Sequence, residues 1–478
     1  MDTLLFTDEP LGSDLPSSSG RNSSFLPVPV SETRLPGSKK PHNERRRVVI
    51  VGAGFGGIEA ARALRNTDVD VILIDRRNHH LFQPLLYQVA TAALSPGDIA
   101  WPIRSIFRAQ KNVTVLMAEV AGVDLGARTV TDGKTKWSFD FLILATGASQ
   151  SYFGHDEWAA DAPGLKSIDD ATSIRQRLLS AFERAEIASE ARDKRALMTV
   201  VVIGGGPTGV EMAGAVAELA HRILPSEFRN IDTAKARILL IDAGPRILAA
   251  FPEKLSDVAR QSLTKMKVEV RTDAIVTDCD GSGVTLGDGE RIEAATVVWA
   301  AGVEASPAAR WLDAPQDRAG RVQVEPDLSV PGYPDTFVIG DTAHLIHKDG
   351  RAVPGVAPAA KQMGRYVGAL IASRVTGRQP GAAFVYRPTG DLATIGRKSA
   401  IVSLGKFQLT GFVGWLFWCL AHIWFLIGFR SRMVVAFEWL WSYVTAQRGA
   451  RLIGAEDYDA SPPDAAPAPN PSPVDAVG

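Results

Sequence analysis

Residues Val48–Glu59 read VVIVGAGFGGIE, and residues Val200–Glu211 read VVVIGGGPTGVE. Across residues 48–64 and 200–216, 8 of 17 aligned positions are identical. In each copy a run of β-branched residues predicts a buried parallel strand, and the glycines after it predict a tight turn into a helix. The N-terminus of such a helix directs free N–H groups at a phosphate, which is how this unit holds a dinucleotide. Two copies predict two dinucleotides on one chain and electron transfer between them.

The three glycines of each copy have different tasks. The first makes the tight turn, the second lets the backbone approach a pyrophosphate, and the third lets the helix pack closely on the strand. Because strand, turn and helix occur in order in both copies, we favour nucleotide binding over a glycine-rich turn that binds nothing. In chain order the six glycines are Gly52, Gly54 and Gly57, then Gly204, Gly206 and Gly209.

Each copy is followed by a second predicted strand that ends in a carboxylate. Asp75 lies 23 residues after Gly52, and Asp242 lies 38 residues after Gly204. An acid at this point accepts hydrogen bonds from a ribose diol and repels a 2′-phosphate, which favours NADH over NADPH. The alternative interpretation is an ordinary turn residue at the end of a strand. The longer second spacing predicts an extra helix or loop within residues 221–237.

Composition excludes several classes of protein. The 478 residues carry a net charge of −1, which gives no argument for nucleic acid as a partner. The only two cysteines, Cys279 and Cys419, exclude a disulfide framework and a cysteine-rich metal or iron–sulfur site, and we predict no metal site. No secretory signal is visible, and residues 1–44 and 455–478 have the Pro- and Ser- or Ala-rich composition of disordered segments.

Three further strand ends suggest how the chain is organised. Residues 141–147 end in Ala-Thr-Gly, residues 296–302 end in Ala-Ala-Gly, and residues 337–341 end in Gly-Asp. This order implies that the first nucleotide domain is interrupted by the second and resumes near residue 303. A helical connector is expected over residues 165–195, with Leu178, Leu179, Phe182 and Ile187 on its apolar face.

These motifs together resemble the two-dinucleotide flavoproteins of the pyridine nucleotide-disulfide oxidoreductase fold, over roughly residues 45–390. The resemblance implies FAD, bound tightly but not covalently, in the first copy and NADH as a substrate in the second. The implied FAD contacts are Gly52, Gly54, Gly57, Asp75, Gln83, Thr146, Gly147, Gly340, Asp341 and Ala357. The implied NADH contacts are Gly204, Gly206, Gly209, Asp242 and Gly302. The redox-active cysteine pair of the family is missing, so disulfide reductase chemistry is excluded.

Residues 80–104 and 354–365 are more specific, because they resemble the type II NADH:quinone oxidoreductases. That family has a quinone motif Ala-Gln-x-Ala-x-Gln, which here reads Ala357-Pro-Ala-Ala-Lys-Gln362, with proline in place of the first glutamine. The resemblance makes Gln362 the quinone carbonyl contact, with Lys361 and Pro358 beside it. Independently, Pro358 suits the first turn of a helix, whose N-terminus would stabilise a reduced flavin.

Glu59 and Glu211 each lie two residues after the third glycine. The simpler interpretation is an acid placed in the first turns of a helix by the helix dipole, and we prefer it for Glu59. For Glu211 the resemblance implies a position at the nicotinamide–flavin junction and a catalytic role in proton delivery to the quinone. Both interpretations of Glu211 stay open at this point.

The C-terminal region differs from the rest of the chain. Residues 397–453 contain seven Lys or Arg and a single acid, and five of the ten tryptophans lie within 27 residues. Tryptophan with flanking arginine is favoured at a lipid headgroup interface. Residues 407–429 are long enough to span a bilayer once, whereas helices over roughly 411–428 and 431–446 would lie on its surface. A buried core or dimer helix explains the clustering of tryptophan and arginine less well.

We therefore expect an α/β protein with two Rossmann-like dinucleotide-binding domains, the second inserted in the first, and a C-terminal membrane-associated helical region. The expected segments are 1–44 (disordered extension), 45–165 with 303–390 (FAD domain), 166–302 (NADH domain), 391–454 (membrane anchor) and 455–478 (disordered tail).

The expected function is respiratory NADH dehydrogenation without proton pumping, at the cytoplasmic face of the inner membrane. The partners would be ubiquinone or menaquinone and the lipid surface, and the family suggests a homodimer. The alternatives are a flavoprotein reductase with a soluble acceptor and a flavin-bearing NADH sensor resembling apoptosis-inducing factors.

Overall fold

The computed structural model describes residues 45–347, 350–378, 381–445 and 448–453. The predicted disordered ends lie outside these residues. The first sheet has six strands in the order β20-β21-β9-β1-β2-β5, parallel except for β20. Its strands are β1 (Arg46–Val51), β2 (Val69–Asp75), β5 (Val113–Met117), β9 (Phe141–Leu144), β20 (Ser329–Val330) and β21 (Tyr333–Val338). This sheet therefore uses strands from both sides of the second glycine motif.

The second sheet is parallel and has the order β13-β12-β11-β17. Its strands are β11 (Thr199–Ile203), β12 (Arg237–Ile241), β13 (Val268–Arg271) and β17 (Thr296–Trp299). The helices of this part of the chain include α5 (Ile168–Ile187), α6 (Ala191–Leu197), α7 (Pro207–Glu218) and α8 (Glu253–Lys265). A π-helical turn continues α7 over Leu219–Ile223, within the long second spacing. The whole sheet is inserted between β9 and β21, although the predicted domain boundaries stay predictions.

The predicted connector helix is present as α5, with one error. Leu178, Leu179 and Phe182 are buried, but Ile187 is 69% exposed, because it is the last residue of the helix. The helical spacing of apolar residues therefore predicted the buried face of α5 correctly up to Phe182, but not at Ile187.

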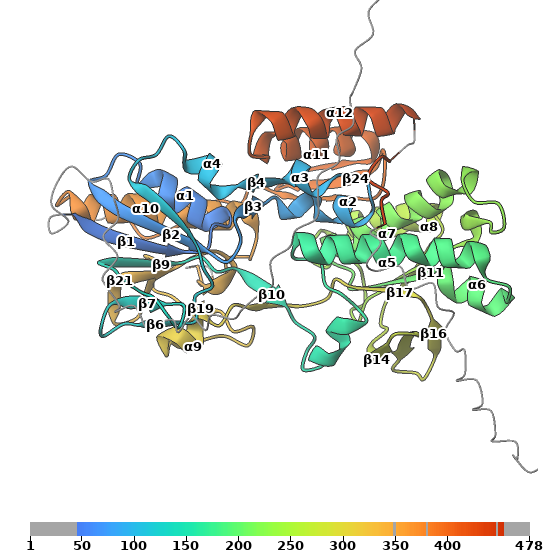
Figure 1. Ribbon diagram of the computed structural model, residues 1–478, viewed down its shortest axis with the longest axis horizontal. Coiled ribbons are helices and arrows are strands. Elements are labelled where there is room, and N and C mark those ends of the chain that lie inside the picture. The colour runs from blue at the N-terminus through green and yellow to red at the C-terminus, as the bar shows by residue number, and fades with distance from the viewer. Residues whose placement is uncertain (1–44, 348–349, 379–380, 446–447, 454–478) are drawn as a thin grey trace, which may run out of the picture. The chain divides into compact units, whose positions relative to one another are not determined.

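Two short strands connect the sheets. β10 (Ala148–Gln150) and β18 (Val303–Ala305) pair antiparallel, and Figure 1 shows β10 running between the two halves of the fold. Each strand directly follows a glycine in the left-handed region, Gly147 at φ +70° and Gly302 at φ +71°. Glycine adopts this conformation without the steric cost of a Cβ, so the chain can turn out of one sheet and cross to the other.

Helices α1 (Phe55–Ala63) and α10 (Ala357–Val375) pack closely through small residues. A Cβ on Gly364 would lie 2.1 Å from the Gly56 oxygen, and one on Gly368 would lie 2.5 Å from the Ala63 Cβ. Because later residues of α1 meet later residues of α10, the two helices run parallel. Their N-termini therefore lie at the same end of the pair, next to the first glycine turn.

The C-terminal region forms an antiparallel sheet and two helices. The strands are β23 (Asp391–Thr394), β24 (Ala400–Leu404) and β25 (Phe407–Thr410), and the helices are α11 (Gly411–Phe425) and α12 (Phe429–Thr445). Figure 1 shows α11 and α12 in orange and red, lying side by side. Among the described residues, none of the helices is both long and apolar enough to cross a membrane.

The remaining elements are short. The helices are α2 (Leu86–Ala90), α3 (Pro96–Ile99), α4 (Ile103–Phe107) and α9 (Ala308–Leu312). The strands are β3 (His79–Leu81), β4 (Ala100–Pro102), β6 (Gly122–Asp124), β7 (Thr129–Thr131), β8 (Lys136–Ser138), β14 (Val276–Asp280), β15 (Gly283–Leu286), β16 (Arg291–Glu293), β19 (Val322–Gln323) and β22 (Ala343–His344).

Candidate functional site

The two glycine turns have nearly the same geometry. A Cβ on the third glycine, Gly57 or Gly209, would lie 1.8 Å from the carbonyl oxygen of Gly52 or Gly204 respectively. That contact is impossible for any side chain, so only glycine allows the helix to start so close to the strand. The second glycines of the two turns, in contrast, have nothing within 4 Å of an added Cβ. Their backbone faces open space at a helix N-terminus, which fits a pyrophosphate in both copies.

The two carboxylates that are predicted to bind ribose accept hydrogen bonds from the backbone of the glycine turns. Asp75 accepts a hydrogen bond of 2.6 Å from the Ala53 N–H, and Asp242 accepts the corresponding bond from the Gly205 N–H. Each carboxylate also accepts a bond of 2.8 Å from a backbone N–H two residues further on. Both acids are therefore part of the loop architecture, and the lone pairs left over are what a ribose diol would use.

Several predicted FAD residues meet at the carboxyl end of the first sheet. Thr146 Oγ1 lies 2.5 Å from Ser306 Oγ and 3.3 Å from Thr342 Oγ1, and Thr342 donates to the Gly147 carbonyl at 3.1 Å. Asp341 directly precedes Thr342 in the turn Gly340–Thr342, and burial raises the pKa of its carboxyl. Ser306 and Thr342 belong to no motif, and sequence reasoning missed them.

The predicted quinone residues begin α10. Ala357 and Pro358 occupy its first turn, as expected for proline. The Lys361 ammonium lies 5.2 Å from the centroid of the Phe55 ring and 4.7 Å from that of Phe425, and burial lowers its pKa. Lys361 therefore joins the first glycine loop to α11 by two cation–π contacts.

The Gln362 side chain is paired with the backbone of a distant residue. Its amide Nε2 donates to the Arg387 carbonyl at 2.9 Å, and its Oε1 accepts from the Arg387 N–H at 3.0 Å. Through these two hydrogen bonds the Gln362 side chain connects α10 to the segment that leads into β23. One N–H and one lone pair of the carboxamide stay uncommitted, so its role as a quinone contact stays a prediction.

Glu211 is buried on α7 and faces the C-terminal sheet. It accepts a hydrogen bond of 3.2 Å from the Thr394 N–H, and the Trp418 indole lies beside it without a hydrogen bond of normal geometry. Burial raises the pKa of the carboxyl to about 8, and the Thr394 and Trp418 groups offset only part of that shift. Glu211 is therefore mostly protonated at pH 7. Glu59, in contrast, forms an ion pair of 2.6 Å with Arg365.

A network of aromatic and polar side chains surrounds Glu211. Burial holds the Tyr87 pKa well above its ordinary value, and the Glu211 charge adds to that shift. Gln88 donates to the Tyr87 hydroxyl at 2.9 Å and accepts from the Trp439 indole N–H at 2.7 Å. Burial lowers the pKa of His422, whose ring stacks on Trp418 at 4.0 Å, to about 4. Tyr87 and Gln88 lie in the segment that suggested a quinone enzyme, but no spacing rule predicts their partners on α12.

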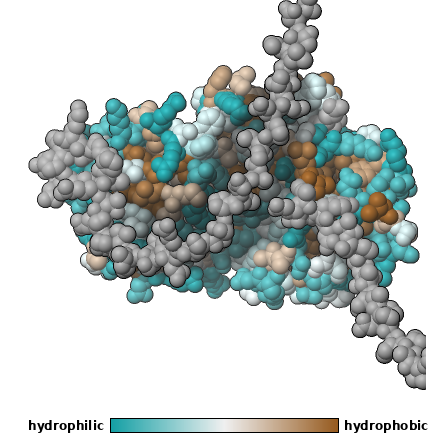
Figure 2. Space-filling view, in the orientation of Figure 1, coloured by the Kyte–Doolittle hydropathy of each residue, from teal (hydrophilic) through white to brown (hydrophobic). Residues whose placement is uncertain are grey.

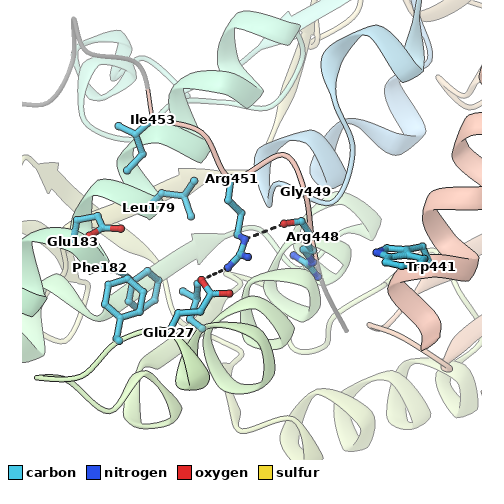
Figure 3. Close-up of a pocket in the computed structure, with 11 residues that line it drawn as sticks. Leu179, Phe182, Glu183, Glu227, Trp441, Arg448, Gly449, Arg451 and Ile453 are labelled. Atoms are coloured by element: carbon cyan, nitrogen blue, oxygen red, sulfur yellow. Dashed lines mark hydrogen bonds and ion pairs between the residues drawn. The ribbon is translucent and has the colours of Figure 1, made fainter. Parts of the chain in front are cut away.

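A cavity of about 530 Å³ lies elsewhere, where residues 448–453 meet α5. In Figure 3 the Arg451 side chain extends toward Glu227, with which it forms an ion pair, and its Nε donates to the Arg448 carbonyl at 2.9 Å. None of the residues that line this cavity is a predicted nucleotide or quinone contact. It is therefore no candidate for the cofactor site.

Comparisons with known proteins show the family to which the chain belongs. The family model described as pyridine nucleotide-disulphide oxidoreductase matches residues 46–364. Two relatives in Mycobacterium tuberculosis carry the names type II NADH:quinone oxidoreductase Ndh and NdhA. The first is 46% identical over 89% of this chain and 93% of its own length, and the second is 47% identical over 86% and 90%.

The solved structures show the same fold at low sequence identity. The structure of NDH2 from Plasmodium falciparum in complex with NADH superposes with a TM-score of 0.78 at 21% identity, over 85% of this chain and 99% of that one. Fold, family model and relatives lead to one assignment. The chain belongs to the type II NADH:quinone oxidoreductases of the pyridine nucleotide-disulphide oxidoreductase family.

Proposed function

We propose that this chain oxidises NADH through a tightly bound FAD and passes the electrons to a membrane quinone, without pumping protons. NADH:quinone oxidoreductase activity follows from membership of the family, which two relatives at 46% and 47% identity support. FAD, the route of the quinone and attachment to lipid are the parts that we propose. When bound, the flavin accepts a hydride and releases electrons singly or in pairs.

The proposed FAD site is the first glycine turn together with the Thr146–Thr342 group. The open backbone at Gly54 fits the pyrophosphate, and Asp75 fits the adenosine ribose. Because α1 and α10 run parallel, the positive ends of both helix dipoles lie at this site and would hold the phosphates and the electron-rich edge of the flavin. The second turn, with Gly206 and Asp242, is the proposed NADH site.

The single observation that carries the quinone proposal is the position of Lys361. Its ammonium lies between Phe55, beside the first glycine turn, and Phe425, which is 43% exposed on α11. A quinone head that reaches the flavin from the α11 surface would meet this charged, half-buried site. Lys361 would then orient the quinone carbonyl, while Gln362 holds the start of α10 to Arg387.

The surface of α11 and α12 supports the proposed attachment to lipid. On the face shown in Figure 2, hydrophilic residues cover most of the surface and hydrophobic residues form separate patches. Of the 22 exposed large apolar side chains among the described residues, twelve lie on these two helices. We call these twelve the apolar stripe, because most recur at spacings of three or four residues. They are Phe412, Val413, Leu416, Leu420, Trp424, Phe425, Phe429, Met433, Phe437, Leu440, Trp441 and Val444.

Exposure of so many apolar side chains on one pair of helices needs a partner. A bilayer surface is the partner in which a long-tailed quinone is dissolved, so we propose that α11 and α12 lie on it. Glu211 faces α11 from the nucleotide side and is protonated near neutral pH, so we propose that it holds a proton for the quinone.

Steady-state NADH oxidation by the FAD-loaded chain, with a short-chain ubiquinone or menaquinone analogue, tests the proposed function. We expect rapid turnover with the quinone and an absorption spectrum of bound flavin. A reductase for a soluble acceptor would keep full activity toward that acceptor after removal of residues 397–478. A flavin-bearing sensor would turn over slowly with every quinone and accumulate a long-lived charge-transfer complex with the nicotinamide. Either result would overturn the proposal.

A further inference from the structure

A second cavity lies at the start of α12. It has a volume of about 360 Å³ and is bounded by the first turn of this helix, the β3–β4 pair, α3 and the first residue of α5. Figure 1 shows α3 below α12, and the two helices are in contact. None of the described residues that line this cavity is a predicted nucleotide or quinone contact. Its apolar wall consists of Pro96, Ala100, Trp101, Pro102 and Ile168.

The cavity is open space in the folded chain. Gly97, on α3, lines it, and no atom lies within 4 Å of a Cβ added to this glycine. The Trp101 ring on the wall is held in place, because a Cβ on Gly428 would lie only 2.9 Å from its Cζ3. The ring therefore packs directly on the turn between α11 and α12. Ligand sites of proteins have volumes of about 300–1,000 Å³, so this cavity is large enough for part of a ligand.

Arg430 supplies a positive charge to the lining. It is exposed in the first turn of α12, and among the described residues its guanidinium has no hydrogen bond and no ion pair. Arg432, two residues further on, is committed, because it donates to the carbonyls of Leu426 at 2.8 Å and Trp424 at 3.0 Å. The donors of Arg430 are therefore available to a ligand.

His79, which also lines the cavity, adds no second charge. Its Nδ1 lies 2.9 Å from the Asn78 Oδ1, and burial together with the Arg77 charge lowers its pKa. The imidazole is therefore neutral at pH 7. The cavity combines a single free cation with an apolar wall, which suits a molecule that has an anionic group next to an apolar part.

The position of the cavity indicates where such a molecule comes from. Phe429, directly before Arg430, is 78% exposed and belongs to the apolar stripe. An exposed aromatic side chain beside an arginine is favoured at the headgroup level of a bilayer. A guanidinium binds a phosphate through two parallel hydrogen bonds. The isoprenoid tail of a quinone, in contrast, carries no charge that Arg430 could bind.

We propose that this cavity binds one anionic phospholipid of the bilayer. The Arg430 guanidinium binds its phosphate, and the adjoining glycerol and first methylene groups lie against Trp101 and Ile168. The inference rests on the proposed attachment of α11 and α12 to lipid and adds a headgroup preference to it. Phosphatidylglycerol keeps a net negative charge, whereas the ammonium of phosphatidylcholine cancels the charge of its phosphate. The chain therefore prefers bilayers that contain phosphatidylglycerol.

The test measures co-sedimentation of the full chain with vesicles of phosphatidylcholine alone and of phosphatidylcholine mixed with phosphatidylglycerol. The readout is the ratio of the affinities for the mixed and the pure vesicles. Gly97→Leu fills the cavity and keeps Arg430, whereas Gly97→Ala leaves most of the cavity open. We expect the ratio to fall about fivefold in Gly97→Leu and in Arg430→Met, which is about 1 kcal/mol, the contribution of one basic residue at an anionic surface. Gly97→Ala keeps the wild-type ratio.

A wild-type ratio in Gly97→Leu overturns the inference even if Arg430→Met lowers the ratio, because the preference would then follow surface charge alone. Equal losses in Arg430→Met and in Lys406→Met, which removes an exposed charge outside the cavity, overturn it for the same reason.

Inorganic phosphate that abolishes the wild-type preference at constant ionic strength would assign the cavity to a soluble anion, which also overturns the inference. NADH oxidation with a water-soluble quinone shows that each variant is folded, and Gly97→Val replaces Gly97→Leu if the latter is not. A wild-type chain that binds neither kind of vesicle would instead contradict the proposed attachment to lipid.

Discussion

The backbone N–H of Thr394 donates a hydrogen bond of 3.2 Å to the Glu211 carboxylate, although 183 residues separate them in the chain. Thr394 lies on β23 of the C-terminal sheet, and Glu211 lies on α7, the helix that follows the second glycine turn. The proposed NADH site and the C-terminal sheet are thus joined through one buried acid. Its protonation state affects the stability of this junction and, under the proposed function, the supply of a proton to the quinone.

Burial of Glu211 makes stability depend on pH in a definite direction. The folded protein keeps the proton up to a pH of about 8, whereas the ordinary value of 4.5 applies to the unfolded chain. Between these values the folded state binds more protons, so stability is full below the lower value and falls as pH rises to the upper one. The loss is about 1.4 kcal/mol per pH unit.

Glu211→Gln mimics the protonated acid and removes this contribution. We expect urea unfolding of the variant to show a flatter fall in free energy over the same pH range. Parallel pH profiles for wild type and variant would mean that the acid titrates normally in the folded protein.

Trp439→Phe removes the indole donor that binds Gln88 Oε1 at 2.7 Å. Because the Gln88 oxygen would stay buried without a partner, we expect a loss of about 1–3 kcal/mol in unfolding free energy. Trp424→Phe is the matched control, because Trp424 is 74% exposed on the neighbouring helix and its loss changes stability little. Equal stability of the two variants would contradict the importance of this bond.

The apolar stripe gives a prediction about lipid binding. Leu420→Ser and Phe437→Ser each remove a side chain that is 61% exposed. Burial of such a side chain in lipid contributes about 1.5–3 kcal/mol, so each substitution should weaken co-sedimentation with phospholipid vesicles about tenfold or more. Met117→Ser, at a position on β5 that is 66% exposed, should leave vesicle binding unchanged. Similar vesicle binding by all three variants would exclude the stripe as the lipid surface.

Asp242 should set the preference for NADH over NADPH. Asp242→Asn keeps an oxygen that can accept from the Gly205 N–H but removes the charge that repels a 2′-phosphate. We expect the ratio of kcat/KM for NADH to that for NADPH to fall at least about tenfold, or about 1.4 kcal/mol. Asp75→Asn, in the first turn, should weaken FAD retention and leave the ratio unchanged. A constant ratio in Asp242→Asn would show that other residues select the nucleotide.

The sequence predicted the parts of this fold that depend on local patterns. The duplicated glycine turns, their strands and the first turn of α10 follow from short-range sterics, since no side chain fits where Gly57 and Gly209 lie. The return of the chain to the first sheet after the second nucleotide unit followed from the order of strand ends. The exposure of Ile187 at the end of α5 could not be predicted in this way. The helical spacing of apolar residues includes Ile187, but it does not show whether another segment covers that side chain.

The sequence predicted the residues of the candidate site less completely than the fold. Ser306 and Thr342 lie far apart in sequence and outside any motif, and the crossing at Gly147 and Gly302 brings their segments together beside Thr146. Gln362 is the last residue of the segment that resembles a quinone motif. The spacing of that motif does not predict that the Gln362 side chain forms hydrogen bonds with the Arg387 backbone. Side-chain contacts between distant segments depend on packing, which local patterns do not determine.

We propose that electrons reach the quinone where Lys361 lies between Phe55 and Phe425. The most direct measurement compares Lys361→Met with wild type by stopped-flow reduction of the flavin by NADH and by steady-state kcat/KM for a short-chain quinone. Lys398→Met is the control, since Lys398 also lies over an aromatic ring, 4.8 Å from the Tyr443 centroid, but away from α10. We predict unchanged flavin reduction and at least a tenfold loss in quinone kcat/KM for Lys361→Met alone, or about 1.4 kcal/mol. Normal quinone kinetics in Lys361→Met would contradict the account.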